Sequence, residues 1–68
     1  MQIELNGAPR ELPDGTDIAT LLELLELGGR RVAVEVNCEI VPRGDHAGHR
    51  LRPGDRVEVV QAIGGGAA

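Results

Sequence analysis

DGTDIATLLELLELGG, residues 14–29, has the periodicity of an α-helix set between segments that read as strands. Its apolar residues recur at i, i+3, i+4 and i+7 and form one face: Ile18, Leu21, Leu22 and Leu25. Its polar residues point away from that face: Thr20, Glu23 and Glu26. The spacing therefore predicts one amphipathic helix, over about residues 17–27.

The boundaries of this helix follow from its flanking residues. Thr16 is the predicted N-cap, and Asp17 sits favourably beside the positive end of the helix. Gly28-Gly29 is predicted to end the helix, because a glycine is the usual residue just past a helix C-terminus.

Five strands are predicted around the helix. The alternation of apolar and polar residues, and the turn residues between the runs, place them over 1–5, 8–12, 31–36, 39–41 and 56–61. Asn6-Gly7 predicts a hairpin turn, and Pro9 indicates an edge or irregular position. Asn37-Cys38 can turn the chain into the short strand 39–41, and Arg43–Arg50 is predicted to be a polar surface loop.

This order of elements favours an α+β domain of the β-grasp, ubiquitin-like type. Its mixed sheet would have four to five strands, with one main helix (about 17–27) on one face. Pairing of the first and last strands in parallel at the centre of the sheet is an expectation by analogy with that fold. The domain is expected to span residues 1–63, followed by a flexible glycine-rich tail over 64–68.

Composition excludes several classes of function. With no aromatic residue and a net charge of −4, the chain of 68 residues offers neither a stacking platform nor a basic surface for nucleic acid. It has no apolar run of membrane-spanning length, its first residues do not form the hydrophobic region of a signal peptide, and its single cysteine suits the reducing cytoplasm, where we expect the protein to act. All seven basic residues are arginines, so the chain cannot link to itself through lysine, although it could donate its C-terminus.

Other candidate sites are better explained as structure. Cys38 is interpreted as a turn cysteine, because the nearby carboxylates would disfavour its thiolate. Asp45-His46 and His49, taken with Cys38, fit no metal-ligand spacing, so no metal site is predicted. Gly64-Gly65-Gly66 is not a phosphate-binding loop, since no helix or lysine follows it.

The tail Ala62–Ala68, AIGGGAA, directly follows the last predicted strand. Taken alone, it could equally be a frayed terminus or a slim peptide that threads into a partner. Residues 62–66, fully extended, would reach roughly 17 Å.

Several segments together resemble the ThiS family of sulfur carriers of thiamine biosynthesis. They are MQIELNG (1–7), LLELL (21–25), VAVEVN (32–37), IVPR (40–43) and PGDRVEVV (53–60). The resemblance covers about the whole chain, and its most distinctive part is Asn37 followed by EIVPR, residues 39–43. The related MoaD carriers of molybdopterin synthesis share the fold and the tail, but tend to carry a proline-containing segment before the glycines; we favour ThiS.

The resemblance implies a carrier rather than an enzyme. A ThiF-like, E1-type adenylyltransferase would use Mg-ATP to adenylate the carboxylate of Gly66, with no cofactor bound by the carrier itself. A sulfur donor such as a cysteine desulfurase would then allow conversion to a thiocarboxylate, which supplies sulfur to a ThiG-like thiazole synthase. Ile63, Gly64 and Gly65 would thread into the partner's active site.

Ala67-Ala68 depart from the pattern of the family, because they tie up the Gly66 carboxyl in an amide. A trimming peptidase could remove them; they could also be an addition introduced by cloning, or mark a carrier that has lost its activity. We expect a native, removable extension.

The partner-docking face is predicted to be the sheet face opposite the helix, with Glu58, Val60 and Ala62 exposed on it. A sulfur carrier for another pathway, a protein modifier that joins Gly66 to lysines of its targets, and a plain interaction module remain the rival interpretations.

Overall fold

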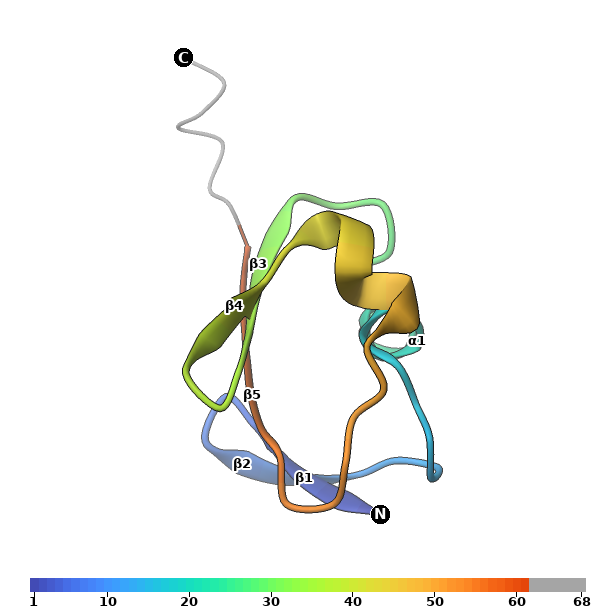
Figure 1. Ribbon diagram of the computed structural model, residues 1–68, viewed down its shortest axis with the longest axis vertical. Helices are drawn as coiled ribbons and strands as arrows, with labels where there is room; N and C mark the ends of the chain where they lie inside the picture. The colour runs from blue at the N-terminus through green and yellow to red at the C-terminus, as the bar shows by residue number, and fades with distance from the viewer. Residues whose placement is uncertain (62–68) are drawn as a thin grey trace.

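The computed structural model describes residues 1–61 of the chain. Within these residues the elements follow in the order β1 Gln2–Leu5, β2 Ala8–Glu11, α1 Ile18–Leu24, β3 Val32–Val36, β4 Glu39–Val41, η1 Arg43–Gly48 and β5 Arg56–Gln61, where η1 is a 3₁₀ helix. The strands form one sheet, and α1 and η1 lie together on one side of it (Figure 1). The predicted α+β, β-grasp architecture is confirmed, with five strands described.

β5 lies at the centre of the sheet, whose strand order is β2-β1-β5-β3-β4. It pairs in parallel with β1 and antiparallel with β3, so the expected parallel pairing of the first and last strands is confirmed. The parallel pairing is short: Glu4 lies opposite Arg56 and Leu5 opposite Val57, and β1 then ends. The pairing with β3 continues to Gln61, which lies opposite Val32. Within residues 1–61, β5 therefore has a strand neighbour on its β3 side only once it has passed Val57.

Two short turns connect the antiparallel pairs β1-β2 and β3-β4. Asn6 and Gly7 have φ angles of 50° and 85°, and Asn37 and Cys38 have φ angles of 53° and 71°. Positive φ at both central residues is what a two-residue type I′ hairpin requires. Both predicted turns are confirmed, and β2, which carries Pro9, is an edge strand as expected.

The helix is shorter than predicted, and both of its predicted boundaries are wrong. Asp17, not Thr16, is the N-cap: its Oδ1 accepts a 2.7 Å hydrogen bond from the backbone N–H of Thr20. Thr16 is buried instead, and its hydroxyl donates to the carbonyl oxygen of Pro13.

At the other end, Glu26, not Gly28, reverses the chain, with a φ of 60°. The Leu27 N–H donates to the Leu22 carbonyl at 2.8 Å and the Glu26 N–H to the Glu23 carbonyl at 2.9 Å. This pair of bonds is a Schellman motif, which satisfies the last free carbonyls of the helix. Glu26 adopts the left-handed conformation despite its steric cost, whereas the sequence pattern predicts that a glycine, at Gly28-Gly29, ends the helix.

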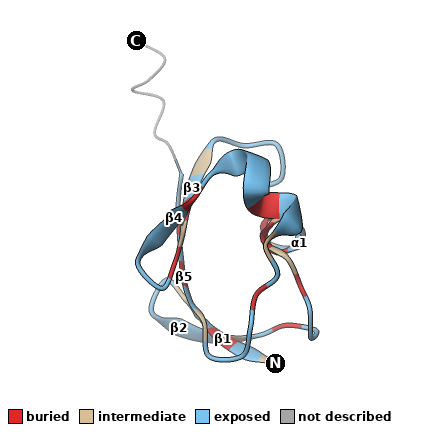
Figure 2. Cartoon of the chain, viewed as in Figure 1, coloured by how far each residue is buried: buried red, intermediate tan, exposed pale blue. Residues whose placement is uncertain are grey.

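The core is entirely aliphatic and lies between the sheet and α1 (Figure 2). As predicted, Val34 and Val36 point inward from β3, and the helix buries its apolar face, with Leu25 only partly covered. Among the described residues, the buried apolar ones are Ile3, Leu12, Ile18, Leu21, Leu22, Val34, Val36, Val41, Leu51, Val57 and Val59.

The segment 43–50 is not the surface loop that its polarity predicts. Residues 43–48 form η1, which packs against α1. His46 is buried, and its Nε2 lies 3.1 Å from the carbonyl oxygen of Val41. Because a carbonyl oxygen can only accept, this ring nitrogen carries the proton and donates.

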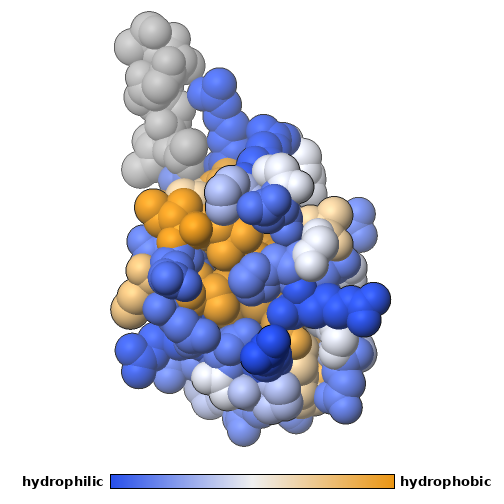
Figure 3. All heavy atoms as spheres, in the orientation of Figure 1, coloured by the Kyte–Doolittle hydropathy of each residue, from blue (hydrophilic) through white to orange (hydrophobic). Residues whose placement is uncertain are grey.

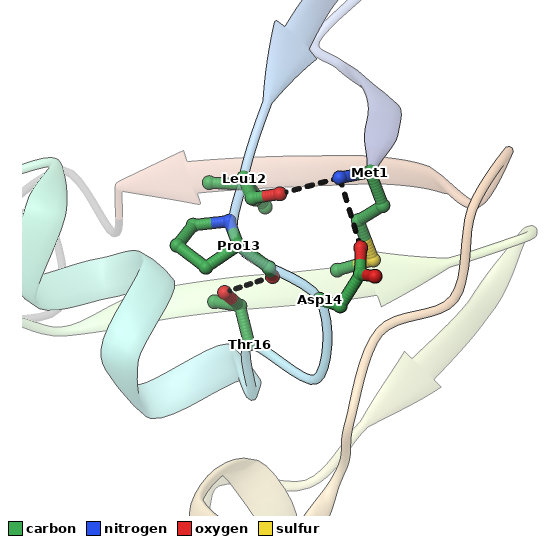
Figure 4. A network of polar contacts seen from close by, with 5 residues as sticks. All are labelled: Met1, Leu12, Pro13, Asp14 and Thr16. Carbon is green, nitrogen blue, oxygen red and sulfur yellow. Dashed lines mark hydrogen bonds and ion pairs between the residues drawn. The ribbon is translucent and has the colours of Figure 1, made fainter.

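A polar network joins the start of β1 to the chain that leads into α1 (Figure 4). The amino group of Met1 donates to the carbonyl oxygen of Leu12 at 2.7 Å and lies 3.0 Å from the Asp14 Oδ1. The bond from Thr16 to Pro13 closes the turn beside it. Among residues 1–61, no helix is long and apolar enough to cross a membrane.

Candidate functional site at the end of β5

The residues singled out by the sequence lie on β5 and just beyond it. Glu58 and Val60 are exposed on β5, as predicted. Ala62, Ile63, Gly64, Gly65 and Gly66 lie outside the described residues. The structure thus defines the strand that leads to the predicted site.

The outer face of the sheet, opposite α1, carries exposed apolar side chains. Val57 and Val59 point into the core, so Glu58 and Val60, which alternate with them on β5, point outward. Val60 is 62% exposed and lies opposite Ala33, which is also exposed. Sequence reasoning missed Ile40 on β4, which is 71% exposed and points to the same face. The sequence does contain a signal for this exposure: Ile40 directly precedes Val41, which points inward, and neighbouring residues of a strand point to opposite faces.

Acidic side chains lie among these apolar residues. Glu58 lies directly opposite Glu35, and Ile40 is on the far side of Glu35. Like charges opposite one another on a sheet repel, so this pair favours a cationic partner group above it. In Figure 3, which views the sheet close to edge-on, apolar side chains gather over β3 and β4 and hydrophilic residues surround them. We call Ala33, Glu35, Ile40, Glu58 and Val60 the outer face.

Two asparagine side chains hold β5 from opposite sides, and sequence reasoning missed this role. The Asn6 side chain accepts from the N–H of Val59 at 2.9 Å and donates to its carbonyl oxygen at 3.4 Å. The Asn37 Oδ1 accepts from the N–H of Arg56 at 3.0 Å. Asn6 therefore contacts the half of β5 nearer the tail, and Asn37 contacts the half farther from it.

The remaining candidates do not form a site. Cys38 is exposed in its turn, which confirms its assignment as a turn residue. Both His46 and Asp45 belong to η1, but His46 is buried whereas Asp45 is exposed. Among the described residues, no three His, Cys, Asp or Glu side chains lie close enough together to hold a metal ion.

A β-grasp body whose central strand is followed in the sequence by a glycine-rich segment places the chain in the class of small ubiquitin-like proteins. Residues 3–66 match the model of the ThiS family, and the chain belongs to that family. The sulfur carrier protein ThiS of Escherichia coli K12 is 35% identical over 97% of this chain and 100% of its own length. The family is that of the sulfur carriers of thiamine biosynthesis, so the predicted resemblance is confirmed.

A solved structure and two longer proteins also match. The crystal structure of the thiamine biosynthesis protein ThiS from Geobacter metallireducens superposes with a TM-score of 0.83 at 28% identity, over 96% of this chain and 99% of that one. Thiazole synthases of Paramagnetospirillum magneticum and Magnetococcus marinus are 39% and 42% identical over 97% of this chain. This chain spans 20% of the length of each of these synthases.

Proposed function

We propose that the chain carries sulfur as a thiocarboxylate on Gly66 and donates it to the thiazole moiety of thiamine. An E1-like, ThiF-type adenylyltransferase binds Mg-ATP and catalyses the attack of the Gly66 carboxylate on ATP. The products are an acyl adenylate at Gly66 and pyrophosphate. Hydrosulfide then attacks the acyl carbon. Where a cysteine desulfurase supplies the sulfur as a persulfide, the attack forms an acyl disulfide, which a thiol reductant cleaves to the thiocarboxylate while the thiol is itself oxidised to a disulfide. The new C–S bond replaces the C–O bond to phosphate, and AMP leaves with the electron pair.

The single observation that carries this proposal is the extent of the family match. It runs from residue 3 to residue 66, so it ends at Gly66 and leaves Ala67-Ala68 outside. The body supplies no catalytic group in this scheme. Its task is to present the tail, and β5 is suited to that task because it is the central strand and is held by β3 up to Gln61.

The acceptor of the sulfur is a ThiG-like thiazole synthase in this proposal. Its support is that proteins named thiazole synthase contain a segment similar to nearly the whole of this chain. When a carrier-like segment is part of a synthase chain, the covalent link keeps the segment and the synthase at a high effective concentration relative to each other. A separate carrier would need a docking surface to achieve the same encounter.

We assign that docking surface to the outer face and the tail residue Ala62. Val60 and Ile40 supply exposed apolar area, and the pair Glu35 and Glu58 supplies negative charge for a basic partner surface. The adenylyltransferase and the synthase would use this face in turn, while Ile63, Gly64 and Gly65 enter the active site.

Removal of Ala67-Ala68 is a necessary first step in this scheme, because the Gly66 carbonyl is held in an amide with Ala67 and only a free carboxylate can be adenylated. A trimming peptidase would perform it. A chain ending at Gly66 provides the matched comparison, since the described fold lies within residues 1–61.

Intact-mass measurement tests the proposal. The full chain and the chain ending at Gly66 are incubated with Mg-ATP, a sulfide source and the ThiF-like enzyme from the same genome. We expect the shorter chain to exchange one oxygen for sulfur, and the full chain to do so only after losing both alanines. A ladder of larger adducts on added proteins would instead identify a protein modifier. No mass change in the shorter chain would refute both.

Transfer is tested separately. The thiocarboxylate form, mixed with thiazole synthase and its small-molecule substrates, is expected to return to the carboxylate as thiazole forms. Turnover with molybdopterin synthase but not with thiazole synthase would reassign the carrier to the MoaD pathway.

A further inference from the structure

In the part of the chain that the structure describes, the β1 side of β5 beyond Val57 is held by the Asn6 side chain instead of a strand. The ladder between β1 and β5 ends with the bond from the Asn6 N–H to the Val57 carbonyl, at 2.9 Å. β1 then turns into β2 at Asn6-Gly7. The Asn6 side chain takes the next rung, because it bonds both the N–H and the carbonyl oxygen of Val59.

The chemistry of a primary amide makes this substitution possible. Its oxygen accepts and its nitrogen donates, as a backbone peptide group does on the edge of a strand. The Val59 N–H can only face Oδ1, and the Val59 carbonyl can only face Nδ2, so the network sets the orientation of the amide. Aspartate could replace only the accepting half.

The position of this contact bears on the tail. Val59 lies two residues before Gln61, the last described residue, and Gln61 is held by β3 opposite Val32. With Asn6 in place, the last part of β5 is held on both edges at Val59. Without it, β5 would be held from Glu58 to Gln61 by β3 alone, and local opening at Val59 would be easier.

From this geometry we infer that Asn6 is a positioning residue, which sets the direction and register in which the tail leaves the body. The inference rests on the proposed function, because the tail must reach a partner's active site while the outer face docks. A reactive group displaced by about 1 Å can lose about a hundredfold in rate. Asn6 touches no reacting atom and acts through Val59.

The chain contains a matched control for this role. Asn37 occupies the same place in the other two-residue turn, with a φ of 53° against 50° at Asn6. Its side chain also bonds the β5 backbone, at Arg56, and in addition donates to Asp55 Oδ1 at 3.1 Å. Asn6→Gly and Asn37→Gly both keep a residue that accepts positive φ, and both remove an amide from β5. They differ in which end of β5 they release.

The first measurement is hydrogen exchange by NMR in the full chain, which requires no partner. We expect Asn6→Gly to speed the exchange of the Val59 amide by about tenfold and Asn37→Gly to leave that amide near its wild-type protection. The reverse pattern, or equal changes in both variants, would overturn the inference. Asn6→Asp, which retains the acceptor for the Val59 N–H, should give an intermediate effect and serves if Asn6→Gly does not fold.

The second measurement is activation of the chain ending at Gly66 by the ThiF-like enzyme. Asn6→Gly is expected to lower kcat/KM about tenfold or more, and mainly through kcat, because the docking face is intact and the tail is misplaced. Asn37→Gly should stay within about twofold of wild type even though both variants lower the Tm. Equal losses of kcat/KM in the two variants would mean that Asn6 only stabilises the fold and does not position the tail. If the wild-type chain is not activated at all, the proposed function fails, while the exchange data still decide whether Asn6 holds Val59.

Discussion

Val60 of β5 lies directly opposite Ala33 of β3, and both side chains are exposed on the outer face of the sheet. One residue later, Gln61 is still paired with Val32. The apolar pair therefore lies at the point where the described body ends and the tail begins. A partner that binds the tail would meet this pair first.

Val60→Asp tests the outer face as a docking surface. Val60 is 62% exposed, so its replacement should lower the free energy of unfolding by only about 1 kcal/mol, from the poor strand propensity of aspartate. Binding to the ThiF-like enzyme and to thiazole synthase should weaken by about tenfold or more, measured by titration calorimetry.

Leu24→Asp is the control for added negative charge, because Leu24 is also exposed but lies on α1, across the core from the outer face. It should bind both partners as the wild type does. If Val60→Asp leaves both activation and sulfur transfer intact, the outer face does not dock them.

Cys38→Gly is expected to stabilise the protein. Cys38 has a φ of 71°, a conformation that disfavours residues with a side chain. Relief of that strain exceeds the entropic penalty of glycine, so the free energy of unfolding should rise by about 0.5–1 kcal/mol in urea titrations. Cys38→Ala removes the thiol but keeps the strain, so it should show no such gain. A gain in the alanine variant would point to the thiol rather than the backbone.

His46→Leu should destabilise the protein. The change leaves the Val41 carbonyl oxygen without its donor, and a buried acceptor that loses its partner costs about 1–3 kcal/mol. His46→Gln keeps a side-chain donor and should recover part of the loss. His49→Leu, at a half-buried position, should change the Tm little. Equal stability of all three variants in thermal unfolding would mean that residues 43–50 behave as the loop that their polarity predicts.

Asp17 should make stability depend on pH in the acid range. Hydrogen bonding with the Thr20 side chain, and with its backbone N–H, keeps the pKa of Asp17 below its usual value of 3.8. Because the pKa is lower in the folded state than in the unfolded state, the carboxylate stabilises the fold above pH 3.8, and this contribution is lost as the pH falls through the lower, folded-state pKa.

Asp17→Asn can still cap the helix but does not titrate. The difference in free energy of unfolding between wild type and Asp17→Asn should therefore shrink as the pH is lowered below about 4, in urea titrations at successive pH values. A difference that stays constant down to pH 2 would show that Asp17 has an ordinary pKa in the folded state.

Local patterns predicted most of the fold because they report which side of each element is buried. The alternating valines of residues 32–36 and the helical spacing of Ile18, Leu21 and Leu22 each identify one inward face, and all these faces meet in the core. Asn6-Gly7 and Asn37-Cys38 predicted turns from their tolerance of positive φ. The exposed positions Glu58 and Val60 followed from the same alternation.

The predictions from the sequence were wrong at positions where a polar residue has a structural role that its residue type does not indicate. Glu26 adopts the left-handed conformation that ends α1, although Gly28 and Gly29 follow only two and three residues later. His46 is buried because its ring can donate to Val41, which no count of polar residues in 43–50 could indicate. Asp17 displaces Thr16 as the N-cap because Thr16 is needed to close the turn at Pro13.

Composition and periodicity were enough to predict the helix, the strands and their inward faces, and analogy with known folds added the β-grasp arrangement. Composition and periodicity depend on residues that are close in the sequence, and the covalent chain already keeps such residues close in space. The tertiary structure alone brings Asn6 to Val59, across a separation of 53 residues, and places Glu35 opposite Glu58. Such contacts depend on strand order and register, which arise only when β5 inserts between β1 and β3 and all three bury their apolar faces at once.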